Sequence, residues 1–69
     1  MYFICEVTTV DGVTAKAMYE EGNMESAKSR YHGFLASCYA NQNLTYFMGM
    51  YCDETGNVIE KDHMYRAAV

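Results

Sequence analysis

The chain has 69 residues, of which 51% are hydrophobic and 20% are charged, and nine acidic against five basic side chains give a formal net charge of −4. This length allows one domain, expected over residues 1–69, with a thin core, because so short a chain removes only about 60% of its unfolded surface on folding. The five basic residues are scattered along the chain, so no basic stripe is available for a phosphate backbone, and we expect no direct nucleic-acid binding.

The three cysteines, Cys5, Cys38 and Cys52, are odd in number and far apart, and no CxxC pair occurs. This usage is typical of reduced thiols that pack as small hydrophobic side chains. No basic N-terminal segment precedes an apolar run, and no apolar stretch approaches the roughly 20 residues that a membrane span requires. We therefore expect a cytoplasmic protein without membrane association.

The N-terminal third reads as a β-hairpin. Tyr2–Val10 and Val13–Tyr19 are rich in aromatic and β-branched residues, and the intervening Asp11-Gly12 favours a type I′ turn, in which both central residues have positive φ. The predicted register pairs Val10 with Val13, Thr8 with Ala15, Glu6 with Ala17 and Ile4 with Tyr19 on one face. The other face then carries Phe3, Cys5, Val7, Thr9, Thr14, Lys16 and Met18.

A single helix is expected between Asn23 and Asn41. The Asn23 side chain is a favourable N-cap, and Asn41 tolerates the left-handed conformation that often ends a helix. Apolar residues recur at helical spacing on one side of this segment, as a helix that covers a core requires. They are Met24, Ala27, Tyr31, Phe34, Leu35 and Cys38.

A second hairpin follows the helix. Leu44–Cys52 is the most apolar run and carries large side chains at alternate positions on both sides, which predicts a central strand. Asp53–Asn57 is the expected turn, with Gly56 at positive φ. Val58–Arg66 is the most polar strand, as is typical of an edge.

These elements predict an α+β domain with ββαββ order: a four-stranded antiparallel sheet and one helix packed on one face. The strand order 2-1-3-4 is preferred to 2-1-4-3 because it puts the two most apolar strands in the middle.

One helix of about 17 residues is about 25 Å long and about 10 Å wide, so it covers only one side of such a sheet. Because the strands are apolar on both sides, we expect the open sheet face to meet another protein surface, most simply in a homodimer. In the alternative, the tyrosine rings fold over the sheet of a monomer. The candidate interface residues are Tyr46, Met48, Met50, Phe47, Tyr51, Phe3, Met18 and Tyr19.

The outer side of the helix is a second candidate interface, because small side chains there allow another backbone to approach closely. Its residues are Ser29, Gly33, Ala36, Ser37 and Ala40. The alternative is that small residues are simply tolerated at exposed positions.

No catalytic residue, cofactor site or metal site is predicted. His32 and His63 are the only histidines, and no metal-ligand spacing, P-loop or nucleophile motif occurs. Cys38 lies on the apolar side of the helix and is expected to be an inert buried thiol. Glu6 stands in an apolar strand; either it is a buried carboxylate with a raised pKa, or Lys16, Arg66 or exposure to solvent stabilises its charge.

A weak resemblance rests on hairpin and helix segments spread over most of the chain. The segments are Val7-Thr8-Thr9, Asp11-Gly12-Val13-Thr14-Ala15, Tyr31-His32, Leu35-Ala36-Ser37, Tyr39-Ala40-Asn41 and Asp53-Glu54-Thr55-Gly56-Asn57-Val58. Together they resemble small uncharacterised proteins of phages and mobile elements of gut bacteria. The resemblance implies no known activity and no functional residues.

Three functions remain open on this basis. The first is a non-catalytic interaction or assembly module that self-associates through the open sheet face. The second, which the resemblance suggests, is a phage or mobile-element accessory protein that acts on a host nucleic-acid-binding protein. The third is a small-ligand-binding protein with a pocket at a dimer interface.

Overall fold

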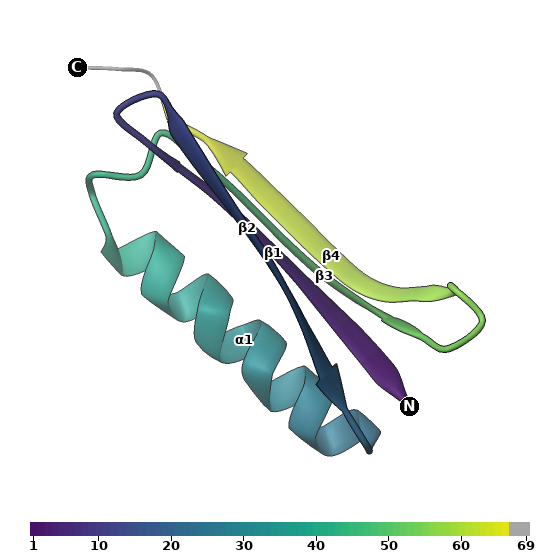
Figure 1. Cartoon of the computed structure of the whole chain (residues 1–69). Helices are drawn as coiled ribbons and strands as arrows, with labels where there is room; N and C mark the ends of the chain where they lie inside the picture. The colour runs from purple at the N-terminus through teal and green to yellow at the C-terminus, as the bar shows by residue number, and fades with distance from the viewer. Residues whose placement is uncertain (67–69) are drawn as a thin grey trace.

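The computed structural model describes residues 1–66 and contains four strands and one helix. The elements are β1 (Tyr2–Val10), β2 (Val13–Glu21), α1 (Met24–Ala40), β3 (Tyr46–Asp53) and β4 (Val58–Tyr65). The strands form one antiparallel sheet in the order β2-β1-β3-β4, and α1 packs on one side of it (Figure 1). The predicted α+β class, element order and strand order are all confirmed.

The first hairpin has the predicted register throughout, with Ile4 opposite Tyr19 and Val10 opposite Val13. Asp11 and Gly12 have φ values of 51° and 78°, as a type I′ turn requires. β2 continues to Glu21, two residues beyond the predicted end at Tyr19. It does so because β1 begins at Tyr2, whose backbone pairs with that of Glu21.

The helix begins as predicted, since the Asn23 side chain accepts a hydrogen bond from the Ser26 N–H at 2.8 Å. Four residues of the apolar stripe are buried: Ala27, Tyr31, Leu35 and Cys38. Phe34 is only half-buried and Met24, in the first turn, is 44% exposed. The buried stripe is therefore narrower than the sequence pattern suggested.

The C-terminal end of α1 differs from the prediction. Asn41 has φ −93° and ψ 102°, so it is extended and not left-handed, and its N–H donates to the Cys38 carbonyl. The Arg66 guanidinium donates to Tyr39 O at 3.1 Å and also to Asn41 O. A charged side chain from the far end of the chain thus stabilises the helix terminus, where positive charge is favourable.

The second hairpin is shorter at its start than predicted. β3 begins at Tyr46 and not at Leu44, which is nevertheless buried as part of the loop that follows α1. At the turn, the Asp53 carboxylate accepts hydrogen bonds from the Thr55 hydroxyl and from two backbone N–H groups, and Gly56 has the predicted positive φ of 86°. A bulge between Tyr51 and Cys52 leaves one extra residue on β4.

The core lies between α1 and the two central strands. Its largest fully buried side chains are Tyr51, Phe47 and Ile4. Gly49, between Phe47 and Tyr51 on β3, lets the helix approach closely. A Cβ at this position would lie 3.0 Å from Phe34 Cδ2 and 3.3 Å from Leu35 Cδ2.

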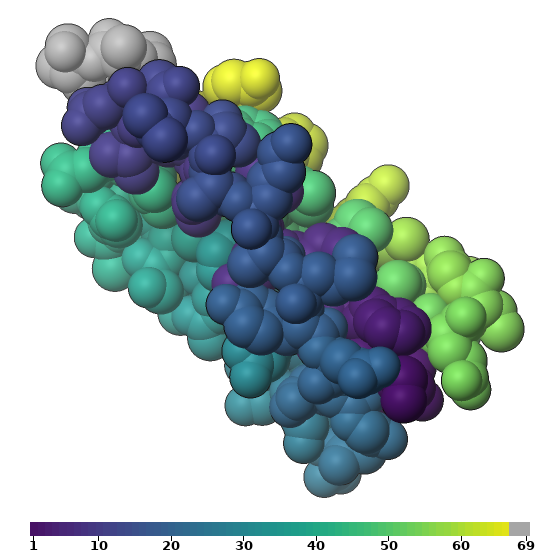
Figure 2. All heavy atoms as spheres, in the orientation of Figure 1, coloured from purple at the N-terminus to yellow at the C-terminus, as the bar shows by residue number. Residues whose placement is uncertain are grey.

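Within residues 1–66 no second layer covers the other side of the sheet, so the molecule is a two-layer body with principal extents of 39 × 18 × 14 Å (Figure 2). In Figure 2 the blue atoms of β2 lie against the teal atoms of α1 along the near side. No helix in this part of the chain is both long enough and apolar enough to cross a membrane.

Candidate interaction surfaces

The uncovered side of the sheet is the principal candidate site, and is called the open face below. Alternate residues of each strand point to it, and the register aligns them in rows across the four strands. The central row is Met18, Cys5, Met50 and Lys61. The row on one side of it is Glu20, Phe3 and Cys52. The row on the other side is Lys16, Val7, Met48 and His63. The row nearest the β1–β2 turn is Thr14, Thr9, Tyr46 and Tyr65.

The open face has an apolar centre and a charged rim. Its β1 and β3 residues carry no formal charge, and those in the three central rows are half-buried by their neighbours alone. The charged side chains Lys16, Glu20 and Lys61 stand on the outer strands. Two large apolar side chains on these outer strands are strongly exposed: Met18 at 66% and Tyr65 at 80%.

Five of the eight predicted interface residues lie on the open face: Tyr46, Met48, Met50, Phe3 and Met18. Phe47 and Tyr51 do not, because they point toward α1 and are each 1% exposed. Tyr19 also lies on the helix side, with the Arg30 guanidinium 4.3 Å from its ring centroid. These three residues belong to the covered side of the sheet, so the prediction that they form part of the open-face interface was wrong.

The predicted interface also lacks four apolar residues of the open face: Cys5, Val7, Cys52 and Tyr65. The alternation of strand residues groups the first three with Phe3 and Met50, so this signal was present in the sequence. It was not decisive because both sides of β1 and β3 are apolar, and alternation alone does not say which side the helix covers.

The second candidate interface is exposed in the structure. Ser29, Gly33, Ala36, Ser37 and Ala40 all lie on the outer side of α1. A Cβ added to Gly33 would have no neighbour within 4 Å. The chain therefore leaves room for another backbone there, although none of these side chains projects far enough to make an anchor.

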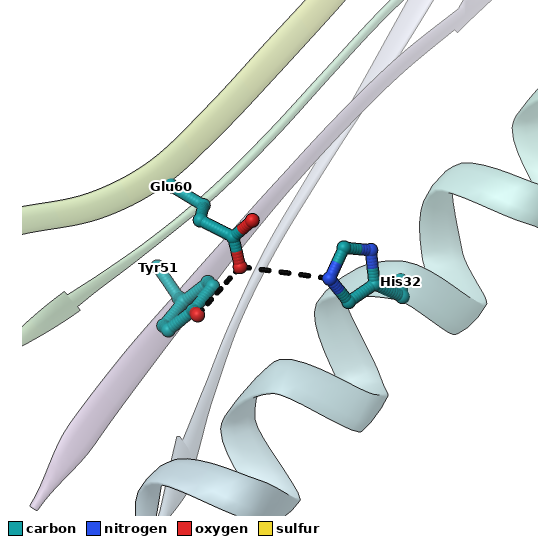
Figure 3. A network of polar contacts seen from close by, with 3 residues as sticks. All are labelled: His32, Tyr51 and Glu60. Atoms are coloured by element: carbon teal, nitrogen blue, oxygen red, sulfur yellow. Dashed lines mark hydrogen bonds and ion pairs between the residues drawn. The ribbon is translucent and has the colours of Figure 1, made fainter.

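A polar cluster lies between α1 and β4 (Figure 3). The Tyr51 hydroxyl donates to Glu60 Oε2 at 2.6 Å, and His32 Nε2 lies 3.5 Å from the same oxygen. About two helical turns further along α1, the Tyr39 hydroxyl donates to Asp62 Oδ2 at 2.9 Å. The two carboxylates on the inner side of β4 are thus both bound by tyrosines.

The electrostatics of this cluster favour a structural role. Burial, and then the hydrogen bond to Glu60, raise the pKa of Tyr51 to about 12. The pKa of Tyr31 is also raised, chiefly by burial and then by the charge of Asp62. Phenols with raised pKa values stay protonated at neutral pH, so Tyr51 acts as a hydrogen-bond donor that ties β4 to the core.

Glu6 lies on the covered side, half-buried beneath α1. Burial raises the pKa of its carboxyl, and the positive charge of Arg30 partly offsets that rise. Arg30 is therefore its counter-charge, in place of the two cations suggested by the sequence. Arg66 binds the end of α1, and Lys16 pairs with Val7 on a row of the open face.

A hollow of about 750 Å³ borders Glu6 between α1 and the β2 side of the sheet. Its lining mixes acidic, hydroxyl and apolar groups, including Glu6, Arg30 and Phe34. It is wide open to solvent. Small-molecule sites usually enclose most of their ligand, so a hollow this open is not proposed as a binding site.

The thiols and histidines form no conventional metal centre. Among residues 1–66, no group of three or more His, Cys, Asp or Glu side chains is placed to hold a metal ion. Cys38 is buried in the core as predicted, and burial raises the pKa of its thiol, which makes it a poor nucleophile.

Comparison with known proteins identifies no relative: no protein-family model, no curated protein and no solved structure matches this chain.

Proposed function

We propose that this protein is a small non-catalytic interaction module that self-associates through its open face. The observation that carries the proposal is the apolar centre of that face, made by β1 and β3 residues that no element within residues 1–66 covers. Monomers seldom leave a contiguous apolar patch of this kind in water, and Met, Phe and Tyr are enriched in interface cores.

The dimensions of the face suit a second copy of the chain. Strands lie about 4.8 Å apart and rise about 3.3 Å per residue, so four strands of about eight residues present roughly 500 Å² on one side. Two stacked copies then bury roughly 1,000 Å², which is the lower limit for a specific protein interface. Sheets that stack face to face, about 10 Å apart, interdigitate such side chains into a common core.

The charged rim is also self-complementary along β2. Lys16 and Glu20 stand on either side of Met18 on the open face. If β2 of one copy lies antiparallel over β2 of the other, each Lys16 meets a Glu20, as a two-fold axis through the Met18 row requires. Opposite charges at a rim contribute more to the register of a complex than to its affinity.

The non-catalytic part of the proposal is supported by the polar cluster, where Glu60 and Asp62 are each bound by a tyrosine hydroxyl. We also propose a reducing compartment, the cytoplasm, on the basis of the three free thiols.

The test is sedimentation velocity over a concentration series, with wild type compared to Met48→Glu. Met48 lies near the centre of the open face, so a carboxylate there would be desolvated in the dimer, and we expect this variant to remain monomeric. Ser29→Glu, on the outer side of α1, is the control and should associate like wild type. Wild type that stays monomeric at high micromolar concentration contradicts self-association.

The outer side of α1 is tested separately with Gly33→Leu. Leucine has room there in the free chain and fills any close backbone contact in an assembly. If Gly33→Leu associates like wild type while Met48→Glu does not, the open face alone makes the interface.

A further inference from the structure

Sulfur-containing side chains gather at the centre of the open face. Five of them lie there, from three strands: Cys5, Met18, Met48, Met50 and Cys52. Cys38, the remaining cysteine, is on the opposite side in the core. Thiolate and thioether sulfurs are the soft ligands that Cu(I) and other soft ions prefer.

Three of these sulfurs form a triangle defined by the strand register. Cys5 pairs directly with Met50 across β1 and β3, where opposite Cβ atoms lie about 4.5–5.5 Å apart. Cys52 is two residues from Met50 on the same strand and so points to the same side. It is the diagonal neighbour of Cys5, at a separation of about 7–8 Å between Cα atoms, which two side chains span.

We propose that Cys5, Cys52 and Met50 bind one soft monovalent metal ion, Cu(I) or Ag(I), on the open face. The two cysteines bind as thiolates and Met50 supplies a thioether. All three donors belong to one chain, so the site forms without a second copy; in the dimer proposed above, the same residues would lie inside the interface.

The charge distribution around the triangle fits a cation. The register makes Cys5 and Cys52 diagonal neighbours, where two thiolates would repel each other. A cation between them removes that repulsion, and each ion bound displaces two thiol protons. The complex then has one net negative charge, next to Lys61, which pairs with Met50 on β4.

The surface beside the triangle is hollowed, so an ion reaches it from solvent. This hollow, of about 380 Å³, is lined by Met48, Met50, Lys61, Asp62 and His63. It offers a thioether and an imidazole next to the site. Zinc, by contrast, favours closed sets of four thiolate, imidazole or carboxylate ligands, and residues 1–66 bring no three such groups together.

The test titrates Ag(I) into the reduced protein, because silver needs no reductant to hold its oxidation state. Native mass spectrometry counts the ions per chain, and competition with a thiol of known affinity ranks the variants. We expect one tightly bound ion per wild-type chain. Loss of that ion is expected in Cys5→Ser and in Cys52→Ser, and weaker binding at unchanged stoichiometry in Met50→Leu.

The matched controls remove a thiol or a thioether that lies outside the triangle. Cys38→Ala removes a core thiol and Met24→Leu removes an exposed thioether at the start of α1, and both should bind silver like wild type. Circular dichroism confirms that each variant is folded; Met50→Leu conserves volume and tests the site if a cysteine variant unfolds. Independent binding at each thiol, or a Met50→Leu variant with wild-type affinity, overturns the three-donor site.

Sedimentation of the same samples separates this inference from the proposed function. Silver binding by a wild-type chain that stays monomeric supports the metal site and contradicts self-association. A chain that binds no silver at a concentration at which it is monomeric contradicts the metal site, whatever it does at higher concentration.

Discussion

The two faces of the sheet are made by the same strands and are similarly apolar, yet they are built from different side chains. The covered face uses large rigid rings, Phe47 and Tyr51, on either side of a glycine that admits the helix. On the same strand, the open face has one ring, Tyr46, followed by the flexible thioethers of Met48 and Met50 and the small thiol of Cys52. Rigid rings specify one packing arrangement, whereas methionine adapts to several partners. Hydrophobicity alone therefore does not distinguish the covered face from the open face.

The largest difference in stability loss between the two faces is expected for two neighbouring residues that lie on opposite sides of the sheet, Phe47 and Met48. Phe47→Ala opens a cavity in the core and should cost about 3–5 kcal/mol, whereas Met48→Ala should cost about 1 kcal/mol or less. A core of this size supplies only about 3–5 kcal/mol in total, so Phe47→Ala should be largely unfolded without denaturant. Urea unfolding at low protein concentration measures both. Equal losses would mean that the two faces do not differ in packing.

The next effect concerns the close approach of α1 to β3. Gly49→Ala puts a methyl group 3.0 Å from the Phe34 ring, so the ring or the helix must shift, at a cost of about 1–3 kcal/mol. The double variant Gly49→Ala with Phe34→Ala relieves the contact and should recover part of that loss. Additive losses in the double variant would show that Phe34 is not the obstacle.

A smaller effect is expected from the residue that holds the end of α1. Arg66→Ala leaves the carbonyls of the last helical turn without their charged donor and should cost about 1–2 kcal/mol. Arg66→Lys keeps the charge but loses the planar guanidinium group, so its stability should lie between those of wild type and Arg66→Ala. Thermal unfolding followed by circular dichroism ranks the three; an Arg66→Ala variant as stable as wild type would contradict this role.

The smallest effect at neutral pH is expected from Tyr51→Phe, about 0.5–1.5 kcal/mol for one hydrogen bond to Glu60. Its pH dependence is more informative. Because the folded state raises the pKa of Tyr51 from 10.0 to about 12, protonation of this phenol stabilises the fold below pH 10, and that contribution is lost as the pH rises to about 12.

Wild-type stability should therefore fall over this alkaline range more steeply than that of Tyr51→Phe. Tyr31 and Tyr39 also have raised pKa values, so a residual decline is expected in the variant. Urea unfolding at a series of alkaline pH values gives the two slopes. Parallel slopes would mean that Tyr51 titrates as it does in the unfolded chain.

Local signals account for most of what the sequence predicted correctly. Asp11-Gly12 determines a turn through its own backbone preferences, and Asn23 caps the helix through its own side chain. The strand order followed from the apolar content of β1 and β3, because a buried strand needs two apolar sides.

The features that could not be predicted depend on contacts between distant parts of the chain. The helix covers the side of the sheet that carries Gly49, because this glycine leaves space for Phe34. The sequence alone does not show that these two residues are in contact. The end of α1 depends on Arg66, 27 residues beyond Tyr39, to whose carbonyl it donates. For the candidate site, alternation separated the two sides of each strand but did not show which side the helix covers, so the predicted interface wrongly included Phe47, Tyr51 and Tyr19.

The pairing of the central strands, β1 and β3, should limit how fast the chain folds. Each hairpin joins neighbours in sequence, but β1 meets β3 only across the helix, with Tyr2 opposite Asp53 and Thr9 opposite Tyr46. Closing such long loops is entropically costly and slow, so we expect the β1–β3 ladder to form last and to set the folding rate. Since the core bridges both hairpins, neither half should be stable alone. Pulse-labelled hydrogen exchange that protects the β1–β3 amides before the hairpin amides would contradict this order.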